Sequence, residues 1–350
     1  MIDTDAKLAT FLTSIKSAAW LALDTEADSL HAYPEKVCLI QASTTAGDEL
    51  IDPLSRLNIG RFFAALAGRE LIMHGADYDL RLLGKHHHFT PAAIFDTMLA
   101  ARLLGERQFG LGSLVEKFLG VKLDKGPQKA DWARRPLTER METYARNDTH
   151  YLKPLADKLA AGLKNRRPWH REICARLIED CNLPQPVDAD GVWRVKGSSK
   201  LSRPALAVLR ELWKWREREA IAANRPPFFV VAHEKLVEIA SAAAANRSFE
   251  PLLPVRMSPR RREGVVAAVR VARALPASRH PEILRSRGHR PSEVEIRRYR
   301  ELEKRRNVHA HQLGIEAALI ASRATLGELA RDWDRYAPGL MNLQRELLAK

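Results

Sequence analysis

Residues 19–28 read AWLALDTEAD, an apolar run that leads into three carboxylates. The apolar residues 20–23 predict a buried strand. Because successive side chains of a strand point to opposite faces, Asp24 and Glu26 project to the same side at the end of this run. Two adjacent carboxylates repel each other and lose hydration unless a cation lies between them. A solvated strand end followed by a turn is the alternative interpretation.

The first 160 residues alternate short apolar runs with longer helical patterns, which together predict an α/β domain. Strands are predicted at residues 20–23, 37–42, 48–52 and 70–74, and helices at 61–66, 79–83, 97–104 and 114–119. Ser113 followed by Glu116 predicts a capping box at the start of the last helix, and Asp96 is interpreted as another helix start. Strands clustered before helices predict a mixed sheet with helices on its faces.

A second acidic segment, HGADYDL at residues 74–80, follows the strand predicted at 70–74. Its glycine and the change to a helical period predict a strand-to-helix turn. Asp77 is then placed to cap the helix and Asp79 to lie in its first turn. Spacing alone leaves open which of the two aspartates faces a site.

A third segment, YARND, places Tyr144 and Asp148 four residues apart, which puts both side chains on one helix face. Such a carboxylate can hold a metal ion while the phenol orients a water molecule beside it. The alternative is an exposed helix in which the tyrosine packs and the aspartate caps or forms an ion pair.

Carboxylates on separate elements that converge are what two magnesium or manganese ions need, because hard cations prefer oxygen ligands. The predicted metal ligands are Asp24, Glu26, Asp148 and one of the two aspartates Asp77 and Asp79. With two ions about 3.5–4 Å apart, one generates hydroxide and the other stabilises the leaving 3′ oxygen. The triplet His86-His87-His88 is a weaker metal candidate, and the motifs GxxxxGK[ST], HExxH and GxSxG are absent from the sequence.

Charge is unevenly distributed along the 350 residues. Residues 1–160 carry 20 Lys/Arg and 21 Asp/Glu, whereas residues 161–350 carry 37 and 22. A near-neutral front joined to a basic rear indicates a catalytic part tethered to a part that grips a polyanion; a merely soluble basic surface is the alternative. The sequence has no run of eighteen apolar residues, so no membrane-spanning helix is predicted. The acidic N-terminus does not resemble a secretory signal. Three cysteines without a CxxC pair favour the reducing cytoplasm.

The rear half is predicted to be helical after a Pro-punctuated connector at residues 182–200. It also contains a repeat with an offset of 90 residues. Phe229, Val230, Val231, Leu236, Ile239 and Ala240 align with Leu319, Ile320, Ala321, Leu326, Leu329 and Ala330. Each copy follows a charged helical segment, so two related small helical domains are predicted.

These motifs, in this order, resemble the ribonuclease D family of the DEDD superfamily of 3′–5′ exonucleases. The resemblance rests on DTE at 24–26, HGADYDLRLL at 74–83, FDTMLAARLLG at 95–105 and YARNDTHYL at 144–152, and it extends to residues 123–145. The rear resembles HRDC domains, named for helicase and ribonuclease D C-termini. The implied organisation is an exonuclease domain at 1–165, a connector at 166–202, an HRDC domain at 203–275 and an HRDC-like domain at 290–350.

The resemblance implies an RNase H-like mixed sheet followed by all-α domains. It also implies that Asp24, Glu26, Asp79 and Asp148 hold two divalent ions and that Tyr144, in the tyrosine-type branch, orients the attacking water. His74 and Gln128 lie in matching segments without an assigned step. The expected activity is 3′–5′ trimming of RNA with a single-stranded 3′ end, such as tRNA precursors. A DNA substrate, a non-catalytic nucleic-acid-binding protein, and HRDC-like domains that bind protein are the alternatives.

Overall fold

The computed structural model describes every residue except 125, 184–187, 189, 285–288 and 350. Its N-terminal part is built on a five-stranded mixed sheet with the order β3-β2-β1-β4-β5. Antiparallel pairing joins β1 (Leu21–Ala27) to β2 (Val37–Thr44) and β2 to β3 (Gly47–Ile51). Parallel pairing joins β1 to β4 (Glu70–Met73) and β4 to β5 (Ala93–Asp96). The predicted mixed sheet with flanking helices is therefore confirmed.

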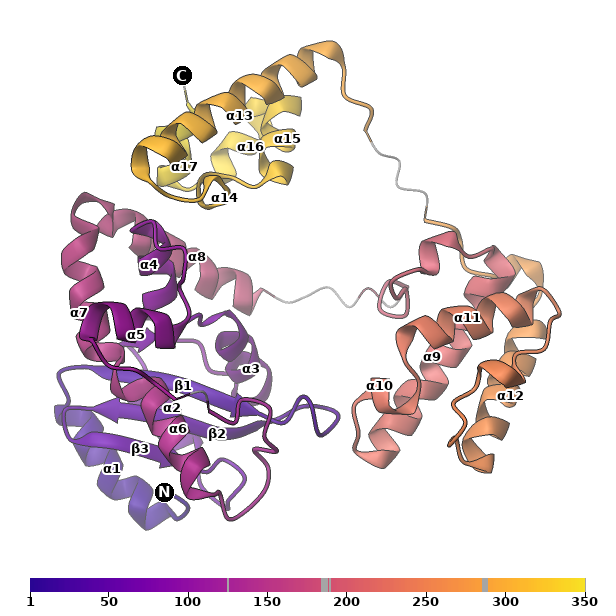
Figure 1. Cartoon of the computed structure of the whole chain (residues 1–350), viewed down its shortest axis with the longest axis horizontal. Coiled ribbons are helices and arrows are strands. Elements are labelled where there is room, and N and C mark those ends of the chain that lie inside the picture. Colours follow the sequence, from indigo (N-terminus) through magenta and orange to yellow (C-terminus); the bar gives the residue numbers. More distant parts are fainter. Residues whose placement is uncertain (125, 184–187, 189, 285–288, 350) are drawn as a thin grey trace. The chain divides into compact units, whose positions relative to one another are not determined.

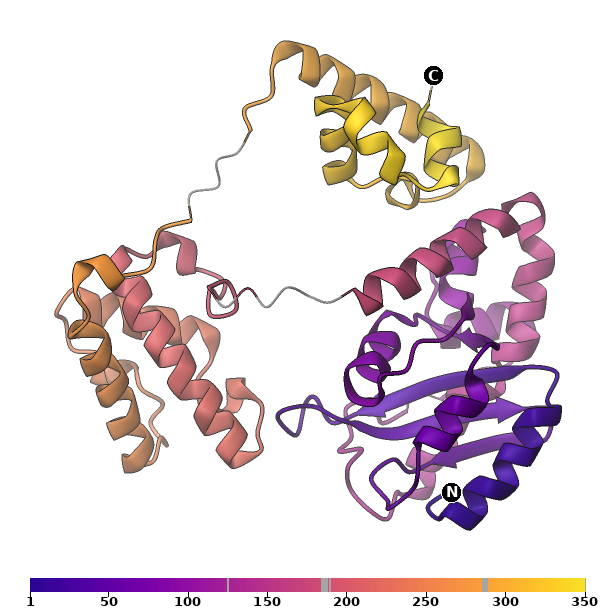
Figure 2. The same ribbon diagram turned by 180° about the vertical axis from the view of Figure 1, so that it is seen from behind.

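Helices cover both faces of this sheet, as seen from opposite sides in Figures 1 and 2. On one face, α1 (Asp5–Ser17), α2 (Gly60–Leu66) and α3 (Asp77–His87) bury an apolar cluster against alternate strand residues such as Leu21 and Leu23. The other face carries the helices α4 (Thr97–Leu103), α5 (Leu111–Leu119), α6 (Glu139–His150) and α7 (Leu152–Leu163). Asp24 and Glu26 alternate with the residues of the first face, so they project toward the second.

Local capping explains where the structure departs from the expected helices. The predicted capping box at Ser113 is wrong, because α5 begins at Leu111 with Gly110 as its N-cap, and Ser113 lies inside the helix. Asp96 does start a helix, since its carboxylate accepts hydrogen bonds from the backbone N–H groups of Met98 and Leu99. The helix α1 and the strand β5 were not predicted from the sequence.

The range 166–202, predicted as a connector, begins with a sixteen-residue helix, α8 (Arg167–Asn182). This helix packs against α3, α4 and β5 because Cys174, Leu177 and Ile178 join the first apolar cluster. The later part of the predicted connector includes residues 184–187 and 189, which lie outside the described residues. Among the described helices, none is long and apolar enough to cross a lipid bilayer.

The rear half folds into two similar groups of helices, here called copy 1 and copy 2. Copy 1 comprises α9 (Arg203–Ala223), α10 (Pro227–Val230), α11 (His233–Ala244) and α12 (Pro259–Arg273). Copy 2 comprises α13 (Glu293–Leu313), α14 (Ala317–Ile320), α15 (Arg323–Arg331), α16 (Trp333–Tyr336) and α17 (Asn342–Leu348). The first two helices of each copy begin and end 90 residues apart, and the third helices begin 90 residues apart, which confirms the predicted repeat.

The chain forms two compact units, and neither of them is continuous in sequence. One unit contains residues Met1–Ala27, Lys36–Leu183 and His289–Lys350, so copy 2 belongs with the exonuclease-like part. The other unit contains Asp28–Glu35 and Pro184–Gly288, and therefore copy 1.

Candidate active site

Strand register places the first two carboxylates. Asp24 and Glu26 stand opposite Gln41 and Leu39 of β2 in the antiparallel ladder. Directly opposite residues share a face, so both carboxylates lie on the side of the sheet that α6 covers. Leu39 belongs to an apolar cluster with Met141 and Ala145 of α6, which fixes this helix over the strand.

A buried polar network holds α6 and therefore Asp148. The Ser43 hydroxyl lies 2.7 Å from the Thr149 hydroxyl and donates to the Asp48 carboxylate at 2.6 Å. The other Asp48 oxygen lies 2.6 Å from Nδ1 of His150, and the Arg146 guanidinium donates to the Asp48 carbonyl. The helix turn that carries Asp148 is thus fastened to the β2–β3 hairpin by several independent contacts.

These placements bring three predicted ligands together. Carboxylate oxygens of Asp24, Glu26 and Asp148 all lie within 4.8 Å of one another, and each side chain is half-buried. Residues far apart in the chain, from β1 and from α6, therefore form one acidic cluster. Their close approach in a partly dehydrated place is unfavourable unless protons or cations neutralise them.

Of the two aspartates left open by the sequence, Asp79 is the one beside this cluster. It is buried, and one of its oxygens accepts a hydrogen bond from the hydroxyl of Thr25, the residue between Asp24 and Glu26. Asp77 is exposed and forms an ion pair with Arg81 at 3.0 Å. Asp79 is not part of the three-carboxylate group, but its charge raises the pKa of Asp24, Glu26 and Asp148.

The turn before α3 is held by Asp96, which explains how Asp79 is positioned. The Asp96 carboxylate accepts hydrogen bonds from the backbone N–H groups of Gly75 and Ala76 at 3.1 and 2.8 Å. Gly75 has a φ of 68°, a left-handed conformation that favours glycine. His74 lies in the same turn, with Nδ1 2.9 Å from the Thr97 hydroxyl.

Tyr144 is held beside Asp148 by contacts with Gly126 and Trp132, which the sequence did not predict. The ring packs on the backbone of Gly126, where an added Cβ would lie 1.6 Å from a ring carbon, and its centroid is 6.0 Å from that of Trp132. Asp148 and Gln128 lie close enough to the Tyr144 side chain that both affect its pKa. Burial beside Asp148 raises the pKa of Tyr144, so the phenol keeps its proton.

The pKa values of the carboxyl groups in and beside the cluster are raised. Burial raises the pKa of Asp24 well above its usual value, and the charges of Asp79, Asp148 and Glu26 raise it further. Burial likewise raises the pKa of Glu26 to about 9, of Asp148 to about 7 and of Asp79 to about 6. Protonated carboxyls packed this closely are the state from which a divalent cation would displace protons.

The donor set fits a hard divalent cation. Among the described residues it consists of carboxylate oxygens alone, and these come from the strand β1 and the last turns of α6. The histidine triplet is not part of it: His86 and His87 close the last turn of α3, and His88 is its left-handed C-cap.

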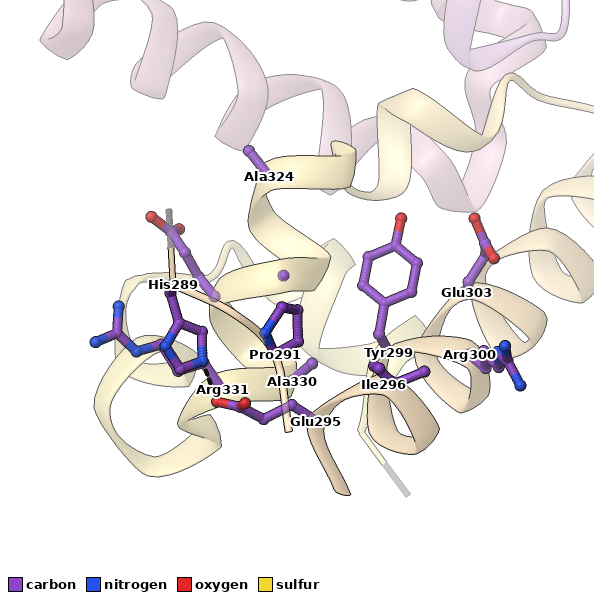
Figure 3. Close-up of a pocket in the computed structure, with 12 residues that line it drawn as sticks. His289, Pro291, Glu295, Ile296, Tyr299, Arg300, Glu303, Ala324, Ala330 and Arg331 are labelled. Atoms are coloured by element: carbon purple, nitrogen blue, oxygen red, sulfur yellow. Dashed lines mark hydrogen bonds and ion pairs between the residues drawn. The ribbon is translucent and has the colours of Figure 1, made fainter. Parts of the chain in front are cut away.

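A surface pocket of about 580 Å³ lies on copy 2, between α13 and α15 (Figure 3). The Tyr299 ring is part of its lining, and His289 Nε2 bonds Glu295 at 2.7 Å. Three glutamates and two arginines line it: Glu295, Glu303, Glu328, Arg300 and Arg331. Because acidic groups balance the basic ones, this pocket does not favour a phosphate.

Comparison with known proteins agrees with this geometry. The 3′–5′ exonuclease family matches residues 1–164, and the HRDC domain family matches residues 205–248. Ribonuclease D of Cronobacter turicensis is 30% identical over 340 residues, which cover 94% of this chain and 90% of that protein. The chain belongs to the ribonuclease D family.

Two further likenesses bear on the extent of this membership. Ribonuclease D of Shewanella sp. (strain ANA-3) is 34% identical over 244 residues, covering 68% of this chain but 63% of that relative's length, which is less than two thirds. The crystal structure of Escherichia coli RNase D, described as an exoribonuclease involved in structured RNA processing, covers 100% of this chain with a TM-score of 0.76 and 26% identity. The ribonuclease D fold is thus shared along the whole chain.

Proposed function

We propose that the protein is a 3′–5′ exoribonuclease that removes nucleotides by hydrolysis assisted by two divalent metal ions. The carboxylate cluster carries this proposal, because oxygens of Asp24, Glu26 and Asp148 within 4.8 Å form a donor set for hard cations beside Tyr144. Asp79 completes the proposed ligand set, and magnesium or manganese are the proposed ions. When bound, such ions activate a water molecule and stabilise the leaving 3′ oxygen.

Each side chain has a separate task in this proposal. Asp24, Glu26, Asp79 and Asp148 hold the ions, with Thr25 orienting Asp79 through their hydrogen bond. Tyr144 keeps its hydroxyl proton and orients the attacking water from its place beside Asp148. Gly126 and Trp132 keep the tyrosine ring in position.

The proposed substrate is RNA with a single-stranded 3′ end, such as a tRNA precursor. Residues 184–288, which include copy 1, carry 20 Lys/Arg and 10 Asp/Glu, whereas residues 289–350 carry 12 and 9. We therefore assign the polyanion grip to copy 1, where phosphate contacts provide affinity without reading sequence. We also propose that residues 290–350 are a second HRDC-like domain. Cys38, Cys174 and Cys181 form no disulfide among the described residues, which supports a location in the reducing cytoplasm.

The decisive experiment compares wild type with Asp24→Asn and Asp77→Asn on 3′-extended tRNA and single-stranded RNA. We expect Asp24→Asn to abolish hydrolysis in Mg²⁺ while RNA binding persists, and Asp77→Asn to leave the rate within about threefold, since Asp77 points to Arg81 instead. EDTA should stop the wild-type enzyme. Full activity of purified Asp24→Asn would refute the metal site, and faster degradation of a matched DNA oligonucleotide would refute the RNA assignment.

A further inference from the structure

Gln41 is a polar side chain in an unusual environment. It is fully buried at 0% exposure, and neither its Oε1 nor its Nε2 has a hydrogen-bond partner among the described residues. Burying an amide without partners is unfavourable, and buried polar groups are normally satisfied. Its neighbours on the same strand face, Leu39 and Ser43, do have packing or hydrogen-bond partners on α6. The amide therefore needs an explanation that apolar packing does not provide.

The strand register places Gln41 beside the acidic cluster. It stands directly opposite Asp24 in the β1–β2 ladder. Directly opposite residues of an antiparallel pair share a face, with Cβ atoms about 4.5–5.5 Å apart. The Gln41 side chain therefore emerges next to that of Asp24, on the side where the carboxylates meet.

Contacts on either side of Gln41 locate it beneath the turn of α6 that carries Asp148. Leu39, two residues before it, clusters with Ala145, and Ser43, two residues after it, lies 2.7 Å from the Thr149 hydroxyl. Residues 145 and 149 flank Asp148 on this helix. Gln41 is thus enclosed between the strand that bears Asp24 and the helix turn that bears Asp148.

We propose that Gln41 is a positioning residue that donates its amide N–H groups to Asp24 and Asp148 when these carboxylates hold divalent cations. A ligating carboxylate keeps lone pairs that do not face the metal, and a buried donor that satisfies them fixes its orientation. The amide carries two N–H groups, enough for one oxygen of each aspartate. This inference rests on the proposed metal site. It gives a role to the buried Gln41 amide, which has no hydrogen-bond partner among the described residues.

The test uses Gln41→Met, which keeps the length of the side chain but removes both N–H groups, and Gln41→Leu as a second apolar variant. Titration calorimetry with Mn²⁺ should show binding weakened by about 10- to 100-fold, the usual effect of losing a group that orients a metal ligand. The melting temperature in EDTA should equal or exceed that of wild type, because an unsatisfied amide has been removed. A stability loss and a binding loss would be separated by these two readouts.

Thr44→Val is the matched control, since Thr44 is a buried polar residue of the same strand that faces away from the cluster, and its hydroxyl accepts a hydrogen bond from the backbone N–H of Ala46 at 3.1 Å. It should lower the melting temperature in EDTA and change Mn²⁺ affinity by less than about threefold. Wild-type affinity in Gln41→Met, or a fall in its EDTA melting temperature like that of Thr44→Val, would overturn the positioning role alone. Absence of Mn²⁺ binding by the wild-type protein would overturn the proposed metal site, and the Gln41 role with it.

Discussion

Copy 1 and copy 2 share a helical frame but differ in what surrounds them. The long helices α9 and α13 both have 21 residues, and each is followed by a short helix and then a longer one. Copy 1 belongs to a unit of its own together with residues Asp28–Glu35, whereas copy 2 is part of the unit that contains the acidic cluster. The repeated pattern of apolar residues therefore specifies the helices, but it does not specify their partners.

The contacts of copy 2 with the exonuclease domain are specific. Arg166 donates to the carbonyls of Leu103 and Leu313 at 2.6 and 2.9 Å, so one guanidinium joins the C-terminal ends of α4 and α13. Trp169 Nε1 bonds Glu346 at 3.1 Å, and Arg102 pairs with Glu316 at 3.0 Å. Copy 2 is thereby built into the catalytic unit, while the excess of basic charge lies in the region of copy 1. The difference teaches that two copies of one helical fold can differ both in the segments they pack against and in the net charge of the region that contains them.

The largest effect is expected where copy 2 touches the exonuclease domain most closely. Gly105→Ala would place a Cβ 2.2 Å from the Gly314 carbonyl oxygen, at a φ of 85°. The left-handed conformation costs about 1–2 kcal/mol for a residue with a Cβ, and the overlap adds about 1–3 kcal/mol. Scanning calorimetry should show the transition of the catalytic unit at a clearly lower temperature.

Gly314→Ala is the control for this prediction. Gly314 also has a left-handed φ of 66°, but its added Cβ would meet nothing within 4 Å. It should therefore lose only the conformational contribution. Equal losses in the two variants would show that the close approach of Gly105 and Gly314 does not hold copy 2 in place.

A second, smaller loss of stability is expected at two buried arginines that occupy equivalent positions 90 residues apart. Arg306 in copy 2 donates to the Ala321 carbonyl at 3.1 Å, whereas Nε and Nη1 of Arg216 in copy 1 have no partner among the described residues. Arg306→Met should lower the free energy of unfolding by about 1–3 kcal/mol, because a buried carbonyl loses its donor. Arg216→Met should lower it less, because two unsatisfied donors leave with the side chain, and its ion-pair partner Glu217 keeps the Tyr33 hydroxyl as a donor. Calorimetry of both variants tests this order, and a larger loss for Arg216→Met would contradict it.

A third, smaller effect concerns the start of α17. The Glu172 carboxylate on α8 accepts hydrogen bonds from the backbone N–H groups of Asn342 and Leu343 at 2.7 and 3.3 Å. Glu172→Ala removes this cap and should cost about 1 kcal/mol. Glu179→Ala on the same helix, where the side chain is exposed, should leave the melting temperature unchanged. A similar shift in both variants would exclude a capping role for Glu172.

The smallest expected effect is on the free energy of RNA binding, and it tests whether copy 1 or copy 2 provides the basic contacts. In the Asp24→Asn background, Arg256→Gln with Arg270→Gln in copy 1 should reduce the salt slope of single-stranded RNA binding by about 1.4, since each phosphate contact contributes about 0.7. Both arginines are exposed, as are Arg297 and Arg323 of copy 2. The matched pair Arg297→Gln with Arg323→Gln should leave the slope unchanged. The opposite ranking, measured by fluorescence anisotropy across salt concentrations, would move the grip to copy 2.

Local patterns in the sequence were sufficient for the strands β1 to β4 of the five-stranded sheet and for part of the acidic cluster. Alternation along β1 predicted that Asp24 and Glu26 share a face, and helical spacing placed Tyr144 and Asp148 on one face of α6, where the two side chains lie beside each other. Each of these relations spans only a few residues, so spacing determines it. The helix α1 could also have been found, because Leu8, Phe11, Leu12 and Ile15 have helical spacing and are buried.

The remaining features depend on contacts between distant segments. The choice between Asp77 and Asp79 is made by Thr25, 54 residues from Asp79 in the sequence. Gly126 and Trp132 are recognisable only once the Tyr144 ring lies against them. Gln41 reads as one more residue of a strand, and only the register opposite Asp24 together with the absence of partners among the described residues distinguishes it.

The catalytic unit is interrupted in sequence by the unit that contains copy 1, and this has a consequence for its biosynthesis. A ribosome completes residues Lys36–Leu183 before it makes Pro184–Gly288, and it makes copy 2 after both. Domains generally fold as units in the order in which they emerge. Copy 1 therefore has the opportunity to fold while the nascent catalytic unit still lacks α13–α17, with the surface of α8 that receives α17 uncovered. Docking of copy 2 then becomes a step of maturation that can occur only after the unit that contains copy 1 has been synthesised.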